Sequence, residues 1–400
     1  MKILQICNKA PYPPRDGHTI AMFNIAEGLT IEGHNVKILS LNTKKHFVDF
    51  SILPKSFINK YQPTYFYINN SVNFISALKN LFSKDSYNVI RFYSKEFEEV
   101  IANVLSKDKF DIVQLETLFS APYIDIIRKC SDVKIILRPH NVEHIIWERR
   151  AAKEKNPIIR YYLAFLAKRL KKYEIEVINK CDGIAAISEI DQASFINLGC
   201  KKPIMNIPIG LDLSNIDNYL SGHSQKNLLF IGSFDWEPNV DGIFWFLDNV
   251  WHKILDSNPK IELVMAGRNI HHFMNKLNYK NLIIAGEVPN AREFMVSNGI
   301  MIVPLRYGGG TRVKIIEAMA YGKPIITTNV GAEGLPVTNW LNIIITLGAD
   351  DFASAIIKLF EEPQYFDFIS KNAQAFAKEN FDIKNITAKL LSFYELILKK

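Results

Sequence analysis

Short apolar runs rich in β-branched residues alternate with segments of helical periodicity along nearly the whole chain. This alternation is typical of βα units, which build parallel sheets covered by helices. In the first half it predicts strands at residues 2–7, 36–41, 111–116, 134–137 and 183–187. In the second half it predicts strands at residues 227–232, 261–266, 282–285, 300–305, 324–328 and 342–346. We therefore expect an α/β protein built from doubly wound domains.

A break in this alternation separates the two sets of strands. Residues 207–213 read Ile-Pro-Ile-Gly-Leu-Asp-Leu, and a polar stretch follows through residues 221–226. A chain of 400 residues is also too long for one ordinary hydrophobic core, so two domains are the default expectation. We therefore expect an N-terminal domain over residues 1–206, a C-terminal domain over 207–380 and a final segment over 381–400.

The stretch that begins with the predicted strand 300–305 has the pattern of a strand, a glycine loop and a helix. Gly308–Gly310 follow the strand, Thr311 stands where an N-cap is expected, and Arg312–Tyr321 keep helical periodicity up to Gly322. Backbone amides in such a loop and at a helix start are free to bind an anion. The stretch is therefore a candidate phosphate site.

Two cations stand in the first turn of this predicted helix, where the helix dipole disfavours them. Arg312 and Lys314 should each cost about 0.3–1 kcal/mol there unless an anionic ligand reverses the sign. The simpler alternative is that Lys314 pairs with Glu317 on a solvated helix face. That alternative leaves Arg312 and the three glycines unexplained, so the pattern favours phosphate binding.

Composition narrows the class of protein. Hydrophobic residues make up 48% and charged residues 22%, as in globular chains, and a net charge of +7 suits an anionic substrate without demanding one. No apolar run approaches the ~18 residues of a membrane span, and the N-terminus turns polar too soon for a secretory signal. The four cysteines are widely separated, which indicates neither a disulfide framework nor a zinc site. We therefore expect a cytoplasmic protein.

Two common nucleotide-binding fingerprints are missing. The segment Asn8–Gly17, directly after the first predicted strand, contains no GxGxxG pattern, and the chain has no GxxxxGK[ST] loop. Ordinary dinucleotide-dependent dehydrogenases and P-loop ATPases are therefore disfavoured.

Five motifs, taken in their order along the chain, carry a resemblance to a known enzyme family. They are Pro14–Gly17, Arg138–Glu143, Gly232–Asn239, Gly286–Val288 and Gly308–Ala320. Together they resemble the retaining glycosyltransferases of the family-4 type, also called glycosyl transferases group 1. The resemblance covers nearly the whole chain and implies the GT-B architecture, in which two Rossmann-like doubly wound domains face each other across a cleft. The segment 381–400 is similar to the family's C-terminal helix, which crosses back to the first domain.

The resemblance implies that a nucleoside-diphosphate sugar binds to the second domain. Glu317 matches the family's glutamate that holds the ribose hydroxyls, and on a helix it shares a face with Lys314. Gly17 matches a glycine whose backbone approaches the donor from the first domain, although a plain β-turn glycine explains the sequence nearly as well. The donor-binding residues that we expect are Gly17, Gly232, Val288, Gly309, Gly310, Thr311 and Glu317.

The chain departs from the family pattern at two places. Many members carry a glutamate eight positions before the one that Glu317 matches, and here that position is Gly309. Backbone amides of the glycine loop would then receive the sugar hydroxyls or the phosphate. In the loop after the strand at 227–232, Phe234 and Asn239 replace two cations that many relatives use for the diphosphate. The cations of the helix after the glycine loop are expected to supply this charge instead.

Three residues are expected to act in catalysis. Charge grows on the departing diphosphate as the glycosidic bond breaks, and Arg312 and Lys314 would stabilise it. His140 matches a family histidine that faces the donor sugar, where it would hydrogen-bond and position the transition state. Without the resemblance, a histidine satisfied within a loop or the core is favoured. No DxD-like carboxylate pair stands at a strand end, so we expect no metal and no cofactor. The resemblance implies retention of the anomeric configuration, with the leaving phosphate accepting the acceptor's proton.

Residues 149–172 form a strongly basic stretch. It contains nine lysines and arginines against the single Glu154, and the apolar residues among them make it a candidate basic amphipathic helix. One interpretation is that this helix rests on an anionic membrane surface near a lipid-linked acceptor. A core-packed helix with a solvated basic face fits the pattern equally well. The aromatic-rich stretch 47–74 is compatible with both an acceptor surface and core packing.

The leading hypothesis is a metal-independent, retaining, hexosyltransferase-like enzyme that uses a nucleoside-diphosphate sugar. Its acceptor would be a glycan or a lipid-linked glycan in surface polysaccharide or glycolipid synthesis, and the enzyme would be peripheral at the inner face of the membrane if the basic stretch binds lipid. A GT-B-like nucleotide-sugar epimerase is a second hypothesis, although no proton-shuttling carboxylate set demands it. A third is a non-catalytic nucleic-acid- or membrane-binding protein with a degenerate sugar site. Only the aromatic and basic residues support it, and we expect no nucleic-acid partner.

Overall fold

The computed structural model describes every residue except 74–75, 77–78, 84, 215, 217–226 and 400. The chain divides into two compact units, of which the first comprises Met1–Gly210 with Ile383–Lys400 and the second comprises Leu211–Asp382. The sequence placed these boundaries after residues 206 and 380. The polar stretch expected to belong to the linker, residues 221–226, lies outside the described residues.

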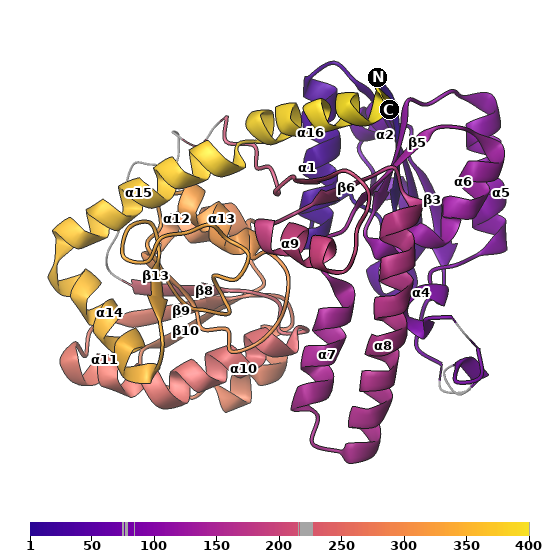
Figure 1. Ribbon diagram of the computed structural model, residues 1–400. Coiled ribbons are helices and arrows are strands. Elements are labelled where there is room, and N and C mark those ends of the chain that lie inside the picture. Colours follow the sequence, from indigo (N-terminus) through magenta and orange to yellow (C-terminus); the bar gives the residue numbers. More distant parts are fainter. Residues whose placement is uncertain (74–75, 77–78, 84, 215, 217–226, 400) are drawn as a thin grey trace. The chain divides into compact units, whose positions relative to one another are not determined.

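The described strands of the first unit form one parallel sheet in the order β3-β2-β1-β4-β5-β6-β7 (Figure 1). Their bounds are β1 (Lys2–Cys7), β2 (Asn35–Thr43), β3 (Thr64–Ile68), β4 (Ile112–Glu116), β5 (Lys134–Arg138), β6 (Gly183–Ala186) and β7 (Ile204–Asn206). The order runs outward in both directions from the neighbouring strands β1 and β4, which makes the sheet doubly wound. Ligands of such sheets bind beyond the carboxyl ends of the strands, near this switch point.

Helices cover both faces of this sheet because successive residues of each buried strand point to opposite sides. Ile3, Ile38 and Ile112 pack with the helices α1 (Gly17–Ile31), α2 (Lys55–Tyr61) and α16 (Ile383–Leu398). The next residues along the same strands, such as Leu4 and Val113, pack on the other face. The helices of that face include α5 (Lys95–Lys107), α6 (Ile124–Cys130), α8 (Pro157–Lys180) and α9 (Glu189–Asn197). The other helices among the described residues of the unit are α4 (Tyr87–Ile90) and α7 (Glu143–Lys153), with 3₁₀ turns at Lys44–His46, Phe50–Ile52 and Leu118–Tyr123.

The final helix α16 belongs to the first unit through its apolar face. Leu390, Phe393, Tyr394 and Ile397, spaced three, one and three residues apart, are each at most 1% exposed. Full burial of one such side chain contributes about 1.5–3 kcal/mol. The helix also crosses α1 closely, since a Cβ added at Gly28 would stand 2.1 Å from Thr387 Oγ1. This packing holds α16 to the first unit although it ends the sequence.

The described strands of the second unit form another parallel sheet, in the order β10-β9-β8-β11-β12-β13. Their bounds are β8 (Asn227–Ile231), β9 (Glu262–Ala266), β10 (Leu282–Gly286), β11 (Ile300–Val303), β12 (Ile325–Thr328) and β13 (Ile344–Thr346). Its described helical segments are α10 (Glu237–Phe246), a π-helical turn (Leu247–Trp251), α11 (His252–Ser257), a 3₁₀ segment (Ile270–Lys276), α12 (Ala291–Ser297), α13 (Val313–Ala320), α14 (Ala349–Glu361) and α15 (Pro363–Phe381). The core of this unit includes Phe246, Trp251 and Phe352. The α/β class and the two Rossmann-like domains are therefore confirmed.

The apolar pattern located all eleven predicted strands and missed two edge strands. β3 lies in the aromatic-rich stretch 47–74, and none of its residues is fully buried, so its aromatic side chains give no clear alternation. β7 has only three residues. Both strands stand at the outer edges of the first sheet, where one side lacks a partner strand. Their sequences are therefore less constrained than those of the central strands.

The basic stretch 149–172 was expected to be one helix, and this expectation was wrong. The structure has the end of α7, a turn at residues 154–156 and then α8. Asn156 Oδ1 caps the new helix by accepting from the N–H groups of Ile158 (2.9 Å) and Ile159 (3.3 Å), and Pro157 occupies the first helical position. No helix among the described residues is both long and apolar enough to cross a membrane.

Candidate functional site

Glycines line the carboxyl edge of the second sheet. Gly232 follows β8, Gly267 follows β9 and Gly286 ends β10. Two of these glycines are joined across the edge, because Gly267 N donates to Gly286 O at 2.9 Å. Gly267 has φ +157, and a Cβ added there would lie 1.7 Å from Gly232 O. Val288, expected to bind the donor, is half-buried just beyond β10. Gly267 thus abuts backbone, whereas the side chains of Asn239 and His271 lie against Gly232 and Gly286.

The glycine loop after β11 wraps around the side chain of Arg312. Gly308 and Gly310 have φ of +131 and +80, which only glycine adopts readily. A Cβ at Gly308 would stand 3.1 Å from both Arg312 and Trp236, and the guanidinium carbon lies 5.4 Å from the centre of the Trp236 ring. Glycine at position 308 therefore lets the loop close over this stacked pair.

Arg312 is directed into this loop and is only 5% exposed. Its Nη1 donates to the carbonyl oxygens of Gly309 and Gly310, and its Nη2 donates to Val330 O at 3.5 Å. The side chain therefore fixes the loop's shape in this structure. Thr311 was expected to cap the helix, which was wrong: Arg312 occupies the N-cap position, and Thr311 Oγ1 is buried with no hydrogen-bond partner in the described chain.

Lys314 lies half-buried in the first turn of α13, without a carboxylate partner among the described residues. Its Nζ donates to Ile231 O at 3.1 Å and to Asn239 Oδ1 at 3.2 Å, and it stands 5.0 Å from the centre of the Phe230 ring. Burial, together with the charge of Arg312, lowers the pKa of Lys314 to about 7. The expected alternative, a solvated ion pair with Glu317, is therefore wrong for this structure.

Glu317 lies one turn further along α13, also half-buried. Burial raises the pKa of Glu317 to about 7, although the positive charge of Arg292 opposes this rise. The helix ends as predicted, because Gly322 adopts φ +63 and Lys323 N donates to Ala318 O at 2.9 Å. α13 thus presents a cation and a carboxyl group, each shifted towards its neutral form, directly behind the glycine loop.

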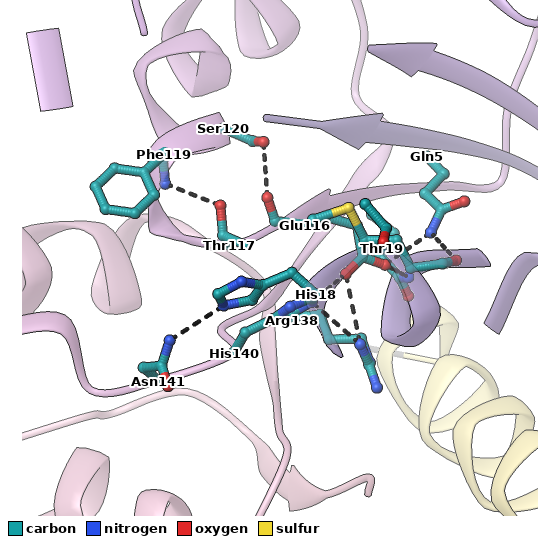
Figure 2. Close-up of polar contacts among 12 residues, drawn as sticks. Gln5, His18, Thr19, Glu116, Thr117, Phe119, Ser120, Arg138, His140 and Asn141 are labelled. Carbon is teal, nitrogen blue, oxygen red and sulfur yellow. Dashed lines mark hydrogen bonds and ion pairs between the residues drawn. The ribbon is translucent and has the colours of Figure 1, made fainter. Parts of the chain in front are cut away.

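In the first unit, His140 forms a buried network with the last residues of two neighbouring strands (Figure 2). Glu116 ends β4 and Arg138 ends β5, and the two residues are partners in the parallel register. Glu116 Oε2 lies 2.7 Å from His140 Nε2 and 3.5 Å from Arg138 Nη1. Glu116 and Arg138 are fully buried, and His140 is 3% exposed. Burial opposes ionisation of Glu116, but the charge of Arg138 and the hydrogen bond from His140 hold its pKa below the usual value.

This geometry defines the tautomer of His140. Burial lowers the pKa of His140 more than Glu116 raises it, so the imidazole is neutral at neutral pH. Arg138 Nη1 also lies 3.2 Å from Nε2, but the contact with Glu116 is shorter, at 2.7 Å. Because an ionised carboxylate only accepts hydrogen bonds, this shorter contact assigns the proton to Nε2, which donates to Glu116. Nδ1 is then a hydrogen-bond acceptor. The expectation of a histidine whose hydrogen bonds are made within the protein is correct for Nε2. Nδ1 can still accept a hydrogen bond from a ligand. The ring stacks on His18 with centroids 5.3 Å apart.

Three further polar residues hold Glu116 in place, and the sequence interpretation did not assign them. Gln5 Nε2 (2.8 Å) and Gln114 Nε2 (2.5 Å) both donate to Glu116 Oε1, and Tyr394 of α16 donates to Gln114 Oε1. The sequence did contain a signal for two of them: Gln5 and Gln114 are the single amide side chains in the otherwise apolar strand segments KILQIC and IVQLE. A buried amide in such a strand needs a polar partner.

Gly17 is the first residue of α1 rather than a β-turn glycine. Asp16 caps the helix: it accepts from Thr19 N at 3.0 Å, and Asp16 N donates to Thr19 Oγ1 at 2.9 Å. Lys9 Nζ lies 2.7 Å from Asp16 Oδ2. Burial opposes ionisation of Asp16, but Lys9 and these hydrogen bonds hold its pKa well below the usual range. The amide of Gly17 thus belongs to a firmly capped helix start.

A second buried network begins at the neighbouring Asn141. Asn141 Nδ2 lies 3.2 Å from Glu143 Oε1 and 3.3 Å from His18 Nε2. Val142 cannot cap α7 with its side chain, and Glu174 of α8 does so instead by accepting from Glu143 N at 2.9 Å. Burial and the nearby charge of Glu174 raise the pKa of Glu143 to about 8. Glu143 therefore favours its protonated form at neutral pH.

Two doubly wound parallel domains, with a glycine-lined strand edge in the second, are the features of a GT-B glycosyltransferase. The comparisons with protein families agree. Residues 15–215 match the family described as Glycosyltransferase Family 4, and residues 225–362 match the one described as Glycosyl transferases group 1. The chain therefore belongs to the family-4 (group 1) glycosyltransferases and is an enzyme of this class.

Similar proteins cover nearly the full length of the chain. A Klebsiella pneumoniae protein described as an uncharacterized 44.6 kDa protein in the cps region is 25% identical, over 96% of this chain and 97% of its own. Anabaena HepE in complex with UDP has a TM-score of 0.65 at 15% identity, covering 99% of this chain and 100% of that one. Sucrose-phosphate synthase from Thermosynechococcus elongatus has a TM-score of 0.72 at 14% identity, with 100% of both chains covered. The solved structures support the fold.

Proposed function

We propose that the protein transfers a sugar from a nucleoside-diphosphate sugar to a glycan or lipid-linked glycan acceptor, with retention of configuration and without a metal ion. In this proposal it acts in surface polysaccharide or glycolipid synthesis, on the cytoplasmic side of a membrane. Membership of the family-4 glycosyltransferases supports the transfer reaction. The relative in a cps region supports polysaccharide synthesis, and the UDP and UDP-glucose complexes of HepE support a nucleotide-sugar donor.

The observation that carries the proposal is the state of Lys314 and Glu317 on α13. Each is shifted to a pKa of about 7, mainly because burial disfavours its charge. An anion beside Lys314 would restore its ammonium form, and hydroxyl donors beside Glu317 would restore its carboxylate. A nucleoside diphosphate supplies both groups, a diphosphate and a ribose. Perturbed groups of this kind gather at ligand sites.

The donor's diphosphate would meet Lys314 and the amides of Gly309, Gly310 and Thr311. The structure has Arg312 donating to the carbonyl oxygens of its own loop, which supports a role in shaping this cradle. Negative charge develops on the leaving diphosphate as the glycosidic bond breaks, and Lys314 in a half-buried site would stabilise it strongly. The leaving phosphate oxygen would accept the proton of the attacking hydroxyl, on the face that the diphosphate leaves.

His140 would position the donor sugar. Its Nδ1 accepts, because Glu116 holds the proton on Nε2, so a sugar hydroxyl would donate to it. Gly232 and Val288, at the carboxyl edge of the second sheet, would contact the nucleotide, and the α1 amide at Gly17 would approach the donor. These residue roles are the ones that the family resemblance implies.

Two measurements test the proposal. Thermal unfolding in the presence of UDP-, GDP- and ADP-sugars should show one donor that raises the unfolding temperature, because a ligand of the folded state stabilises it. With that donor, the protein should release the nucleoside diphosphate when glycan acceptors are added, with EDTA present. Donor conversion without any acceptor would indicate the epimerase instead. No donor binding across the panel would contradict the proposal.

A further inference from the structure

Two stacked histidine rings lie at the carboxyl edge of the first sheet, and the residue roles proposed above use only one of them. His18 is the second residue of α1, which follows β1, and His140 follows β5. Their ring centres lie 5.3 Å apart, and their planes are 21° from parallel (Figure 2). The strands β1 and β4 are neighbours at the switch point of this sheet, where ligands of doubly wound sheets bind. His18 is therefore placed to contact the same ligand as His140.

Asn141 determines the tautomer of His18. Its Nδ2 lies 3.3 Å from His18 Nε2 and 3.2 Å from Glu143 Oε1. An amide NH₂ group only donates hydrogen bonds, so Nε2 of His18 accepts, and the ring proton is then on Nδ1. Asn141 is itself only 8% exposed, and its second contact, with Glu143, holds the amide in this orientation. His18 thus has an Nδ1–H group that can donate.

Both rings are uncharged at neutral pH. Shielding from water, together with the charge of Lys9, lowers the pKa of His18 to about 3. Burial lowers the pKa of His140 as well. A cationic His18 would carry a proton on Nε2, directed at the NH₂ group of Asn141, and the neutral ring avoids this conflict.

The Nδ1 atoms of the two rings remain available to a ligand. The described chain gives neither atom a hydrogen-bond partner. His18 is an exposed residue. His140 is 3% exposed, yet its Nδ1 is not among the fully buried polar atoms that lack a partner, so this atom reaches the surface. The rings therefore offer one donor, Nδ1–H of His18, and one acceptor, Nδ1 of His140.

A donor beside an acceptor selects hydroxyl groups. A phosphate or carboxylate oxygen only accepts, and an ammonium group only donates, whereas a hydroxyl does both. One oxygen can bridge two nitrogens that lie up to about 5.6–6 Å apart, because each hydrogen bond spans about 2.8–3.0 Å. The 5.3 Å between the ring centres is within this limit.

We propose that His18 is a specificity-determining residue that binds one sugar hydroxyl jointly with His140. The hydroxyl accepts from Nδ1–H of His18 and donates to Nδ1 of His140, and Asn141 is a positioning residue that acts through His18. The hydroxyl belongs to the transferred sugar or to a sugar of the acceptor, which present the same chemistry. This inference rests on the proposed function for its substrate class, whereas the two tautomers are properties of the protein without substrate.

Spectra of the ¹⁵N-labelled histidine rings in the full-length protein test the tautomers. We expect Nδ1–H for His18 and Nε2–H for His140. Asn141→Ala should release His18 into a mixture of both tautomers and leave His140 unchanged, since Glu116 still accepts from it. His252, an exposed histidine on α11, is the reference ring. The same tautomer in both rings of the unmodified protein would overturn the inference.

Two variants separate the hydrogen bond of His18 from its stacking. Phenylalanine keeps a ring against His140 but has no N–H group, so His18→Phe should weaken sugar binding about 5- to 20-fold. Asparagine carries an amide nitrogen at about the place of Nδ1, so His18→Asn should stay within about threefold of the unmodified protein. His252→Phe is the matched control and should change binding less than twofold. His18 and His252 are both exposed, so unfolding temperatures should change little.

Two arms identify the sugar. Calorimetry compares UDP-glucose, GDP-mannose and ADP-glucose with their nucleoside diphosphates, and a loss in His18→Phe for a nucleotide sugar alone identifies the transferred sugar. An unchanged donor affinity with a raised KM for octyl glucoside or octyl galactoside identifies the acceptor. Deoxy analogues of that sugar then locate the hydroxyl. At one position its removal should cost about 5- to 20-fold in the unmodified protein and less than twofold in His18→Phe.

Two results with these variants would overturn the inference. Unchanged donor affinity and unchanged acceptor KM in His18→Phe would mean that His18 binds no sugar. Equal losses in His18→Phe and His18→Asn would mean that the imidazole ring, and not its N–H group, is needed. In both cases the unmodified enzyme would still bind its donor. Absence of donor binding by the unmodified protein would contradict the proposed function and its substrate class, so the two failures are distinguishable.

Discussion

Replacing Glu116 by glutamine perturbs the buried network around His140 with little change of shape. Glu116 and Arg138 are both 0% exposed, and glutamine would leave the guanidinium without its carboxylate. Removal of one partner of a buried ion pair costs about 3–5 kcal/mol. In a domain of this size, 1 kcal/mol shifts the unfolding temperature by about 2–4 °C. We therefore expect the transition of the first unit to fall by roughly 6–20 °C.

The same substitution should change the tautomer of His140. The glutamine amide can present its NH₂ group to Nε2, which then accepts, and the ring proton moves to Nδ1. A sugar hydroxyl would then lose its acceptor. Loss of one such hydrogen bond between neutral groups costs about 1–3 kcal/mol when a buried group is left unpaired, which corresponds to a fall in kcat of roughly 5- to 150-fold.

Calorimetry would measure the fall in unfolding temperature. The release of nucleoside diphosphate, measured well below the unfolding temperatures of both proteins, would give kcat, and ¹⁵N spectra of the histidine rings would report the tautomer. Ile101→Ala is a matched control, because Ile101 is fully buried in the core of the same unit and its truncation costs about 2–5 kcal/mol. The control should lose stability and keep kcat. A Glu116→Gln protein with kcat within twofold of the unmodified enzyme, or with unchanged ring spectra, would refute the tautomer argument. An unchanged unfolding temperature would refute the ion-pair argument.

Three other predictions concern pH and backbone geometry. The pKa of Glu143, raised to about 8 from 4.5, means that the folded chain keeps a proton that the unfolded chain releases, so stability should fall as pH rises from about 4.5 to 8. Unfolding temperatures of Glu143→Gln should lack this slope, whereas those of Glu148→Gln, on the exposed side of α7, should keep it. The pKa of Lys314, lowered to about 7, predicts that nucleotide affinity measured by calorimetry falls by up to tenfold per pH unit above 7, and Lys314→Met should abolish this dependence. Gly267→Ala should lower the free energy of unfolding in denaturant by about 1–3 kcal/mol or more, because its Cβ would meet Gly232 O. Gly33→Ala, at φ +80 with open space around it, should cost only about 1–2 kcal/mol of backbone strain.

The features that the sequence predicted correctly are local. Central strands such as Lys2–Cys7 are buried on both faces, so their apolar runs are nearly continuous and easily located. The end of α13 at Gly322 was also predictable, because a left-handed residue after a helix is usually glycine. The glycine-rich stretch beyond β11 could be recognised as a loop for the same reason.

The features that the sequence left open depend on contacts between distant residues. Thr311 has the chemistry of an N-cap, but Trp236 and the loop carbonyls draw Arg312 inward and shift the helix start. The partner of His140 was hidden because Glu116 comes 24 positions earlier and meets it only through the sheet register. Lys314 and Glu317 are three positions apart on a helix, a spacing that is compatible with a solvated ion pair. Only the packing of α13 shows that both side chains are half-buried.

The ribose contact of Glu317 is the central claim about the donor site, and a double-mutant cycle measured by calorimetry tests it most directly. The cycle uses whichever of UDP, GDP and ADP raises the unfolding temperature most, together with its 2′,3′-dideoxy analogue. Both are titrated into the unmodified protein and into Glu317→Gln, with Glu293→Gln as an exposed control. If Glu317 binds the ribose hydroxyls, the coupling between them should be about 1.5–3 kcal/mol. A coupling near zero, with the nucleotide still bound, would contradict it.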